Sequence, residues 1–151
     1  MEQRYIDSLT EICGKANVFY EMVDIERYLY DETEEYVRPK ACEDCIVVRP
    51  GTYEEVSEIL KWANKELVPV IPRGGGTGAC GAAIPTEPSV IMSMERFRKI
   101  VEVDETNMMI TCQTGVTLAS LNEYLAKNVH ALYFPCHPGD EGAQVGDMCI
   151  E

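Results

Sequence analysis

The feature that most constrains this chain is a glycine-rich segment placed directly after a short apolar run. Val68-Pro69-Val70-Ile71 is typical of a β-strand, and Pro72-Arg73 and then five glycines within the eight residues from Gly74 to Gly81 follow it. Because glycine has no Cβ, successive backbone N–H groups can close around an anion and the chain can adopt positive φ. The segment predicts a strand followed by a phosphate-binding loop, with a tight surface turn as the alternative.

Two common nucleotide-binding motifs do not fit this segment. Gly76-x-Gly78-x-x-Gly81 has the spacing of a Rossmann fingerprint, with Glu102 or Asp104 as the ribose-binding acid. A Rossmann loop must open a helix, whereas residues 82–88 contain two prolines and are too few for a helix before the next strand. A Walker A loop is excluded because the chain has no Gly-Lys-Ser/Thr.

The remaining sequence predicts an α+β domain with a mixed sheet flanked by helices. A small βαβ unit is expected over about residues 45–72, in which Thr52 and Glu55 form a capping box at the start of the helix. The other predicted elements are a helix over 2–16, an irregular acidic segment over 18–40, strands over 90–94, 100–103, 109–112 and 131–134, a helix near 117–127 and a loop over 136–148. This divides the chain into residues 1–44 and a domain over 45–151.

Charge and hydrophobicity narrow the possible partners. A formal net charge of −13 would repel a phosphate backbone, so nucleic acid is not an expected partner. No apolar run approaches the roughly 18 to 20 residues of a membrane span, and residues 1–7 lack the layout of a signal peptide. A cytoplasmic location is therefore expected.

The cysteines and histidines offer a weak metal-binding alternative. Seven cysteines are an odd number and lie among apolar residues, as reduced thiols do. Cys42 and Cys45 form a CxxC that Cys136 and His137 could complete as a zinc site, but structural zinc usually takes two such pairs. A buried Cys45 thiol at a strand is favoured, no metal is predicted, and His130 is expected in a solvated turn.

Four segments, in this order, resemble the FAD-binding domain of the vanillyl-alcohol oxidase and p-cresol methylhydroxylase superfamily. They are Ile46–Val56, Val70–Gly78, Gly115-Val116 and Phe134–Gly139. This superfamily includes the glycolate oxidase flavin subunit and D-lactate dehydrogenases. Four ordered matches are more specific than a glycine-rich loop alone.

The resemblance implies FAD as cofactor, with its diphosphate wrapped by the glycine-rich loop. The implied cofactor-binding residues are Pro72, Arg73, Gly74, Gly75, Gly76, Thr77 and Gly78, together with His137, Pro138, Gly139, Gln144 and Gly146. Thr77 stands where members with covalently attached flavin have a histidine, so the FAD is expected to be non-covalent.

The resemblance further implies oxidation of a small 2-hydroxy acid such as glycolate or D-lactate, with electrons leaving to an iron–sulfur subunit, an electron-transfer flavoprotein or a quinone. The family keeps its catalytic residues beyond the part matched here, so none is assigned. The chain is expected to be the opening portion of a longer enzyme, inactive and weak in FAD binding by itself, and to self-associate through an uncovered sheet edge.

Two alternatives to this enzyme remain open. Asp147 occupies a position where the family has glycine, and a carboxylate beside a diphosphate costs Coulomb energy, which fits a catalytically silent nucleotide-binding or assembly module. The other is a related flavin reaction such as reduction of an enolpyruvyl sugar nucleotide. A reading frame that continues past Glu151 into a second domain would favour the enzyme.

Overall fold

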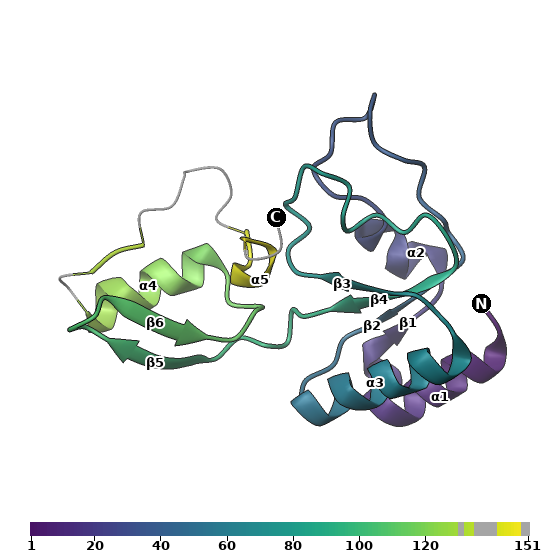
Figure 1. The fold of residues 1–151 in the computed structure, drawn as a ribbon, viewed down its shortest axis with the longest axis horizontal. Helices are drawn as coiled ribbons and strands as arrows, with labels where there is room; N and C mark the ends of the chain where they lie inside the picture. Colours follow the sequence, from purple (N-terminus) through teal and green to yellow (C-terminus); the bar gives the residue numbers. More distant parts are fainter. Residues whose placement is uncertain (130–131, 135–141, 149–151) are drawn as a thin grey trace.

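The structure, a computed structural model, describes residues 1–129, 132–134 and 142–148 and has two lobes (Figure 1). The first lobe contains a four-stranded sheet. Its strands, in spatial order, are β1 (Val18–Phe19), β2 (Cys45–Val48), β4 (Ser89–Ser93) and β3 (Val70–Arg73). The predicted mixed sheet is confirmed, because β1 is antiparallel to β2 whereas β2 and β3 both run parallel to β4.

The order of the strands differs from the prediction in one respect. The unit formed by β2, helix α3 (Tyr53–Glu66) and β3 exists, but β4 lies between its two strands. The strand predicted over 90–94 therefore joins the first sheet. The other two strands of that group, β5 (Ile100–Asp104) and β6 (Met109–Cys112), form a separate antiparallel pair in the second lobe.

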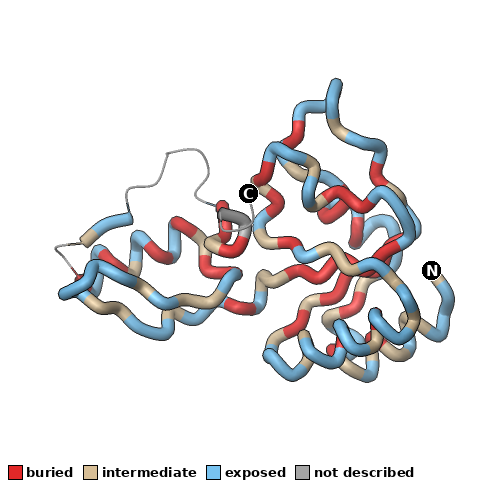
Figure 2. Tube along the Cα trace, in the orientation of Figure 1, coloured by how far each residue is buried: buried red, intermediate tan, exposed pale blue. Residues whose placement is uncertain are grey.

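Alternating side chains of the central strands build two cores, one on each face of the first sheet. Ile46 and Val48 pack with α1 (Gln3–Cys13) and α3 on one face. Cys45 and Val47 pack on the other face with apolar residues of the segment 25–41. All four residues of β2 and all five of β4 are buried (Figure 2). These continuous apolar strands are typical of a sheet covered on both faces.

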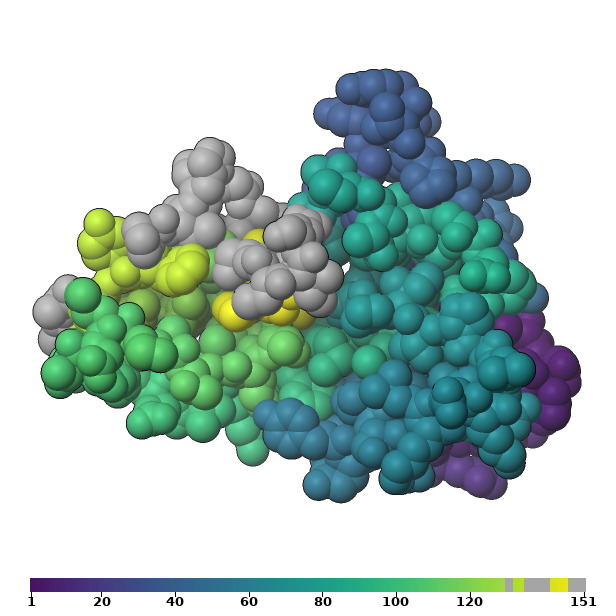
Figure 3. Space-filling view, in the orientation of Figure 1, coloured from purple at the N-terminus to yellow at the C-terminus, as the bar shows by residue number. Residues whose placement is uncertain are grey.

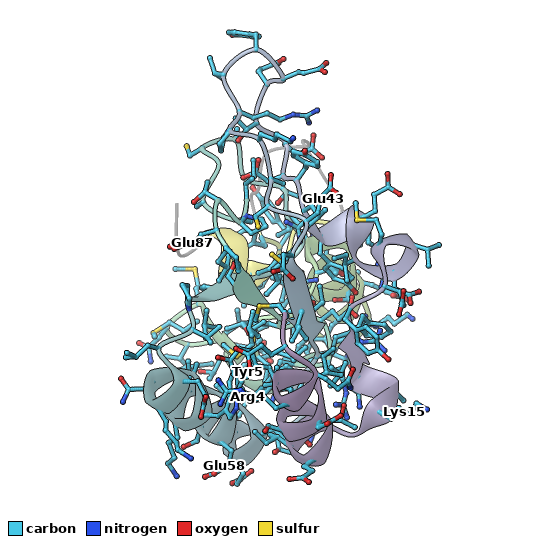
Figure 4. All side chains as sticks on the ribbon, turned by 90° about the vertical axis from the view of Figure 1, so that its right-hand side faces the viewer. Arg4, Tyr5, Lys15, Glu43, Glu58 and Glu87 are labelled. Atoms are coloured by element: carbon cyan, nitrogen blue, oxygen red, sulfur yellow. The ribbon has the colours of Figure 1, made fainter. Side chains whose placement is uncertain are left out.

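Helices α1 and α3 lie side by side on the first face (Figure 4). The ring of Tyr5 packs edge-on against Trp62, with 5.3 Å between the ring centroids, and Arg4 pairs with Glu66 at 3.3 Å. At the start of α3, Thr52 Oγ1 accepts from the Glu55 N–H at 3.1 Å, as predicted. The Glu55 carboxylate, however, accepts from the N–H of Gly51 at 2.7 Å instead of that of Thr52.

The segment predicted to be irregular over 18–40 contains regular structure that covers the second face. After β1 it forms α2 (Met22–Ile25) and a 3₁₀ turn (Glu26–Tyr28), and Ile25 and Leu29 are fully buried. Burial of these side chains against the sheet stabilises the short helix, although the acidic local sequence does not favour one. The prediction of an irregular segment was wrong here because it considered the local sequence alone. Residues 31–38 then project from the surface (Figure 3), where Tyr36 is 84% exposed.

The second lobe has a small core between its two strands and α4 (Leu118–Asn128). Leu121 and Leu125 of α4 pack against Val103 and Ile110 of the strands. Thr117 caps α4 in a box with Ser120, so the predicted start of this helix is confirmed. Residues 132–134 do not form the predicted strand, and Ala131 lies outside the described residues.

Self-association stays a prediction. The strand pair β5–β6 of the second lobe is the surface through which we expect it. Within the described residues, β5 and β6 pair only with each other, and Val101 and Met109 are 64% and 65% exposed. We expect light scattering to show concentration-dependent association that a Val101→Lys/Met109→Lys double variant reduces. Val23→Lys, at a position 84% exposed on the first lobe, is the matched control. A monomer at every concentration would contradict the prediction.

Candidate cofactor site

The glycine-rich loop leaves the first sheet at the carboxyl end of β3. Since β2, β4 and β3 run parallel, their carboxyl ends share one edge of the sheet, the edge at which open sheets of this kind bind ligands. Strand β3 ends at Arg73 and the loop begins at Gly74. No helix follows between Ala79 and Pro88, so the Rossmann alternative is excluded.

The loop uses glycine where a side chain would not fit. Gly76 has φ +73°, and a Cβ on it would lie 2.0 Å from Nη2 of Arg73. Gly81 also has positive φ, at +77°, but more space around it. Gly75 is exposed between the partly buried Gly74 and the buried Gly76, so the loop presents backbone to the surface.

The Arg73 side chain fixes the loop from beneath. Arg73 is 6% exposed, and its Nη2 donates to the backbone carbonyls of Tyr30 at 2.8 Å and Arg27 at 3.3 Å. The N–H of Glu32 donates to the carbonyl of Gly78 at 2.9 Å. Residues 27–32 thereby hold both ends of the loop. The Arg73 guanidinium also places a buried positive charge next to the loop.

This arrangement is compatible with the binding of a diphosphate, as predicted from the sequence. The loop carries no Cβ at its centre and exposes its backbone at Gly75, and the buried Arg73 cation lies close to Gly76, in a chain whose net charge of −13 supplies no general attraction for anions. Anion binding by the backbone N–H groups of Arg73–Gly78, helped by the charge of Arg73, stays a prediction; Pro72 has no N–H and could only shape the loop. Among the seven predicted residues of this loop, Arg73 has a buried guanidinium that binds protein carbonyls.

The second predicted stretch is attached to the other lobe. The Gly146 N–H donates to Thr114 O at 2.8 Å, and a Cβ on Gly146 would lie 2.9 Å from the Cβ of Thr114. Gln144 forms a bridge with Thr117 and is 8% exposed, with its Oε1 buried and without a hydrogen-bond partner among the described residues. His137, Pro138 and Gly139 lie outside the described residues, so their predicted contacts stay predictions.

The CxxC behaves as a packed turn in the described part of the chain. Cys45 is 3% exposed, and its Sγ lies 3.2 Å from the carbonyl oxygen of Cys42, to which it donates. No group of three or more His, Cys, Asp or Glu among the described residues could hold a metal ion. Cys136, His137 and His130 are outside those residues.

None of the helices in the described residues combines the length and the hydrophobicity of a transmembrane span.

Thiol reactivity should separate the exposed cysteine of the loop from the buried ones. Burial raises the pKa of Cys13 to about 11 and also raises that of Cys45, whereas Cys80 is exposed. A thiol of pKa 11 is thiolate in roughly one molecule per thousand at pH 8. We expect iodoacetamide to modify Cys80 well before Cys13 or Cys45, as followed by peptide mass spectrometry. Equal rates in the folded chain would contradict this, and urea should equalise them.

The sequence comparison identifies the class of protein that this fold and loop define. Residues 45–147 match the FAD binding domain family, so the chain belongs to that family. The fold agrees, because p-cresol methylhydroxylase superposes with a TM-score of 0.78 over 96% of this chain and 28% of its own, at 21% identity. At that identity the likeness shows the fold alone.

Two relatives are similar in sequence. A D-lactate dehydrogenase of Archaeoglobus fulgidus is 46% identical over 82% of this chain, and a glycolate oxidase subunit of Bacillus subtilis is 33% identical over 87%. The chain spans 27% of the length of each. The family and the p-cresol methylhydroxylase type of fold predicted from the four motifs are thus confirmed, with FAD as the cofactor.

Two features near the carboxyl ends of these strands were missed by the sequence analysis. The carbonyls of Arg27 and Tyr30 bind Arg73, and no signal in the sequence could have selected them, because every residue carries a carbonyl. The second feature is a group of arginines near the same strand ends, outside the glycine-rich loop. Its signal was present, since Arg96 and Arg98 stand close together in an acidic chain.

Proposed function

We propose that this chain is the FAD-binding portion of a flavin-dependent oxidoreductase that oxidises a small 2-hydroxy acid such as glycolate or D-lactate. The observation that carries the proposal is the loop Pro72–Gly78, in which Gly75 is exposed and Gly76 packs against the buried Arg73 guanidinium. The similarity to a D-lactate dehydrogenase and a glycolate oxidase subunit supports the substrate class.

The chain's own contribution is to bind and orient the cofactor. Bound FAD supplies the acceptor for the electron pair removed from the substrate. The loop amides would hold the diphosphate, Arg73 would offset its charge, and Gln144 and Gly146 would border the cofactor from the second lobe. Thr77 offers no imidazole for covalent attachment, which supports non-covalent FAD.

The electron-accepting partner and a cytoplasmic location stay predictions. The division of the chain at residue 44 also stays a prediction. A catalytically silent nucleotide-binding module is the second candidate. The sequence departure at Asp147, where the family has glycine, supports it, because an acidic residue in a diphosphate-binding stretch costs Coulomb energy.

The proposal is tested by adding candidate acids to the flavin-loaded protein without oxygen. The test uses a longer natural chain that contains these residues, because this chain by itself is expected to be inactive and to bind FAD weakly. We expect D-lactate or glycolate to bleach the visible absorbance of oxidised flavin, whereas the corresponding acids without the 2-hydroxyl, propionate and acetate, leave it unchanged. Flavin that binds but is bleached by none of the 2-hydroxy acids would favour the silent module. A protein that never acquires flavin would overturn both candidates.

A further inference from the structure

A second cluster of positive charge lies near the carboxyl edge of the sheet, outside the glycine-rich loop. A pocket of about 500 Å³ is lined by Arg27, Arg49, Arg96 and Arg98 with a single acid, Glu95. These are four of the chain's 13 basic residues, in a protein of net charge −13. We call this group the arginine pocket.

The single acid of the arginine pocket is already engaged. Glu95 Oε1 accepts from Nη1 of Arg49 at 2.9 Å and from the hydroxyl of Tyr28 at 3.2 Å. Burial of Tyr28, and then the nearby charge of Glu95, raise the pKa of the tyrosine, so its hydroxyl stays a donor. One carboxylate cannot balance four guanidinium groups. Glu55, 3.6 Å from Arg96 Nη1, offsets part of the remaining charge.

The backbone and neighbouring groups hold these arginines in place, with donors to spare. Arg49 Nη2 donates to Ala16 O at 3.0 Å and Arg96 Nη1 to Arg49 O at 2.8 Å. Arg98 Nε donates to the carbonyl of Glu95. Each guanidinium has five N–H donors in a rigid fork, and Arg49 Nε is buried without a hydrogen-bond partner among the described residues.

The topology explains how the cluster forms and separates it from the loop. Arg49 follows β2, and Glu95, Arg96 and Arg98 follow β4, so two parallel strands deliver them to one edge. No residue of Gly74–Gly78 lines the pocket. Arg27 connects the two sites, because its side chain lines the pocket while its carbonyl accepts from Arg73.

We propose that the arginine pocket is a binding site for a phosphate-type dianion, separate from the diphosphate loop. Guanidinium forks bind phosphate oxygens in pairs, and a dianion balances the excess charge better than a monocarboxylate does. The phosphate group could be a free ion or part of a larger ligand that extends from the loop. The proposal does not depend on FAD binding.

The test is titration of the 151-residue chain with inorganic phosphate, by calorimetry and by Tm, against chloride at equal ionic strength. We expect saturable binding that Arg27→Gln and Arg98→Gln each weaken about tenfold, as loss of one charge-assisted contact does. Lys61→Gln, which removes an exposed cation on α3, should stay within about twofold of the parent chain. Tm in chloride and circular dichroism show that each variant is folded.

A Gly76→Val variant distinguishes the two sites. We expect it to keep phosphate binding, which would place a free phosphate ion in the arginine pocket even where flavin binding is lost. Binding that Gly76→Val removes, and that both arginine variants keep, would assign the anion to the loop and overturn the proposal. Absence of any saturable difference between phosphate and chloride would overturn it as well.

Discussion

In a longer natural protein that contains this chain, replacing Gly76 by valine is expected to abolish FAD binding, with a loss of roughly 100-fold or more in affinity, or about 3 kcal/mol. Gly76 has φ +73°, which a β-branched residue adopts only with strain. Its new Cβ would also lie 2.0 Å from the buried guanidinium of Arg73, which would have to leave its carbonyl partners. The loop would therefore lose both its backbone shape and its supporting charge. Fluorescence titration with FAD measures the effect.

Gly14→Val is the matched control for the strain of positive φ. Gly14 has φ +78°, almost the same as Gly76, but no atom lies within 4 Å of the position of its Cβ, and it ends α1 far along the chain from the loop. Both variants should lose stability from the backbone alone, about 1 to 2 kcal/mol. Only Gly76→Val should lose FAD. Unchanged affinity in Gly76→Val, with the protein folded, would remove the loop as the cofactor site.

The glycine-rich loop could be predicted from the sequence because its cause is local. Five glycines after a β-branched run need no distant partner to indicate exposed backbone, and prolines at 85 and 88 are enough to exclude a helix. The same holds for α4, where Thr117 and the leucines that follow fix the start and the buried face. Features of this kind depend on residues that are close together in the sequence, so the tertiary fold does not change them.

Strand order could not be predicted in the same way, because it depends on partners far apart in the chain. Nothing within Val90–Met94 indicates that this strand enters between β2 and β3 instead of pairing with β5. The short helix α2 was missed for a related reason. Its few residues form a helix because Ile25 packs against Val47 and Ile91 on the sheet, not because of their own helix propensity.

Gly115→Ala is expected to cause a large loss of stability, although it adds only one methyl group. Gly115 lies where the chain leaving β4 meets the chain returning from β6, and its N–H donates to Phe97 O at 2.8 Å. An added Cβ would lie 2.2 Å from Met94 O and 2.8 Å from Phe97 O. These are backbone atoms, and Met94 is itself tied to β3 through its N–H and Arg73 O. The junction of the two lobes must therefore move.

We expect Gly115→Ala to cost about 3 kcal/mol or more, which lowers Tm by roughly 6 to 12 °C for a chain of this length. Gly51→Ala is the control, because its Cβ would lie 2.4 Å from Nη2 of Arg96, the far end of a partly exposed side chain that can rotate toward solvent at the cost of its hydrogen bond to Arg49 O. Neither glycine has positive φ, so the two variants differ mainly in the rigidity of the neighbour. Thermal unfolding followed by circular dichroism should show a small shift for Gly51→Ala and a large one for Gly115→Ala. Equal shifts would mean that the backbone at Met94 and Phe97 yields as readily as a side chain, and that the junction between the lobes is soft.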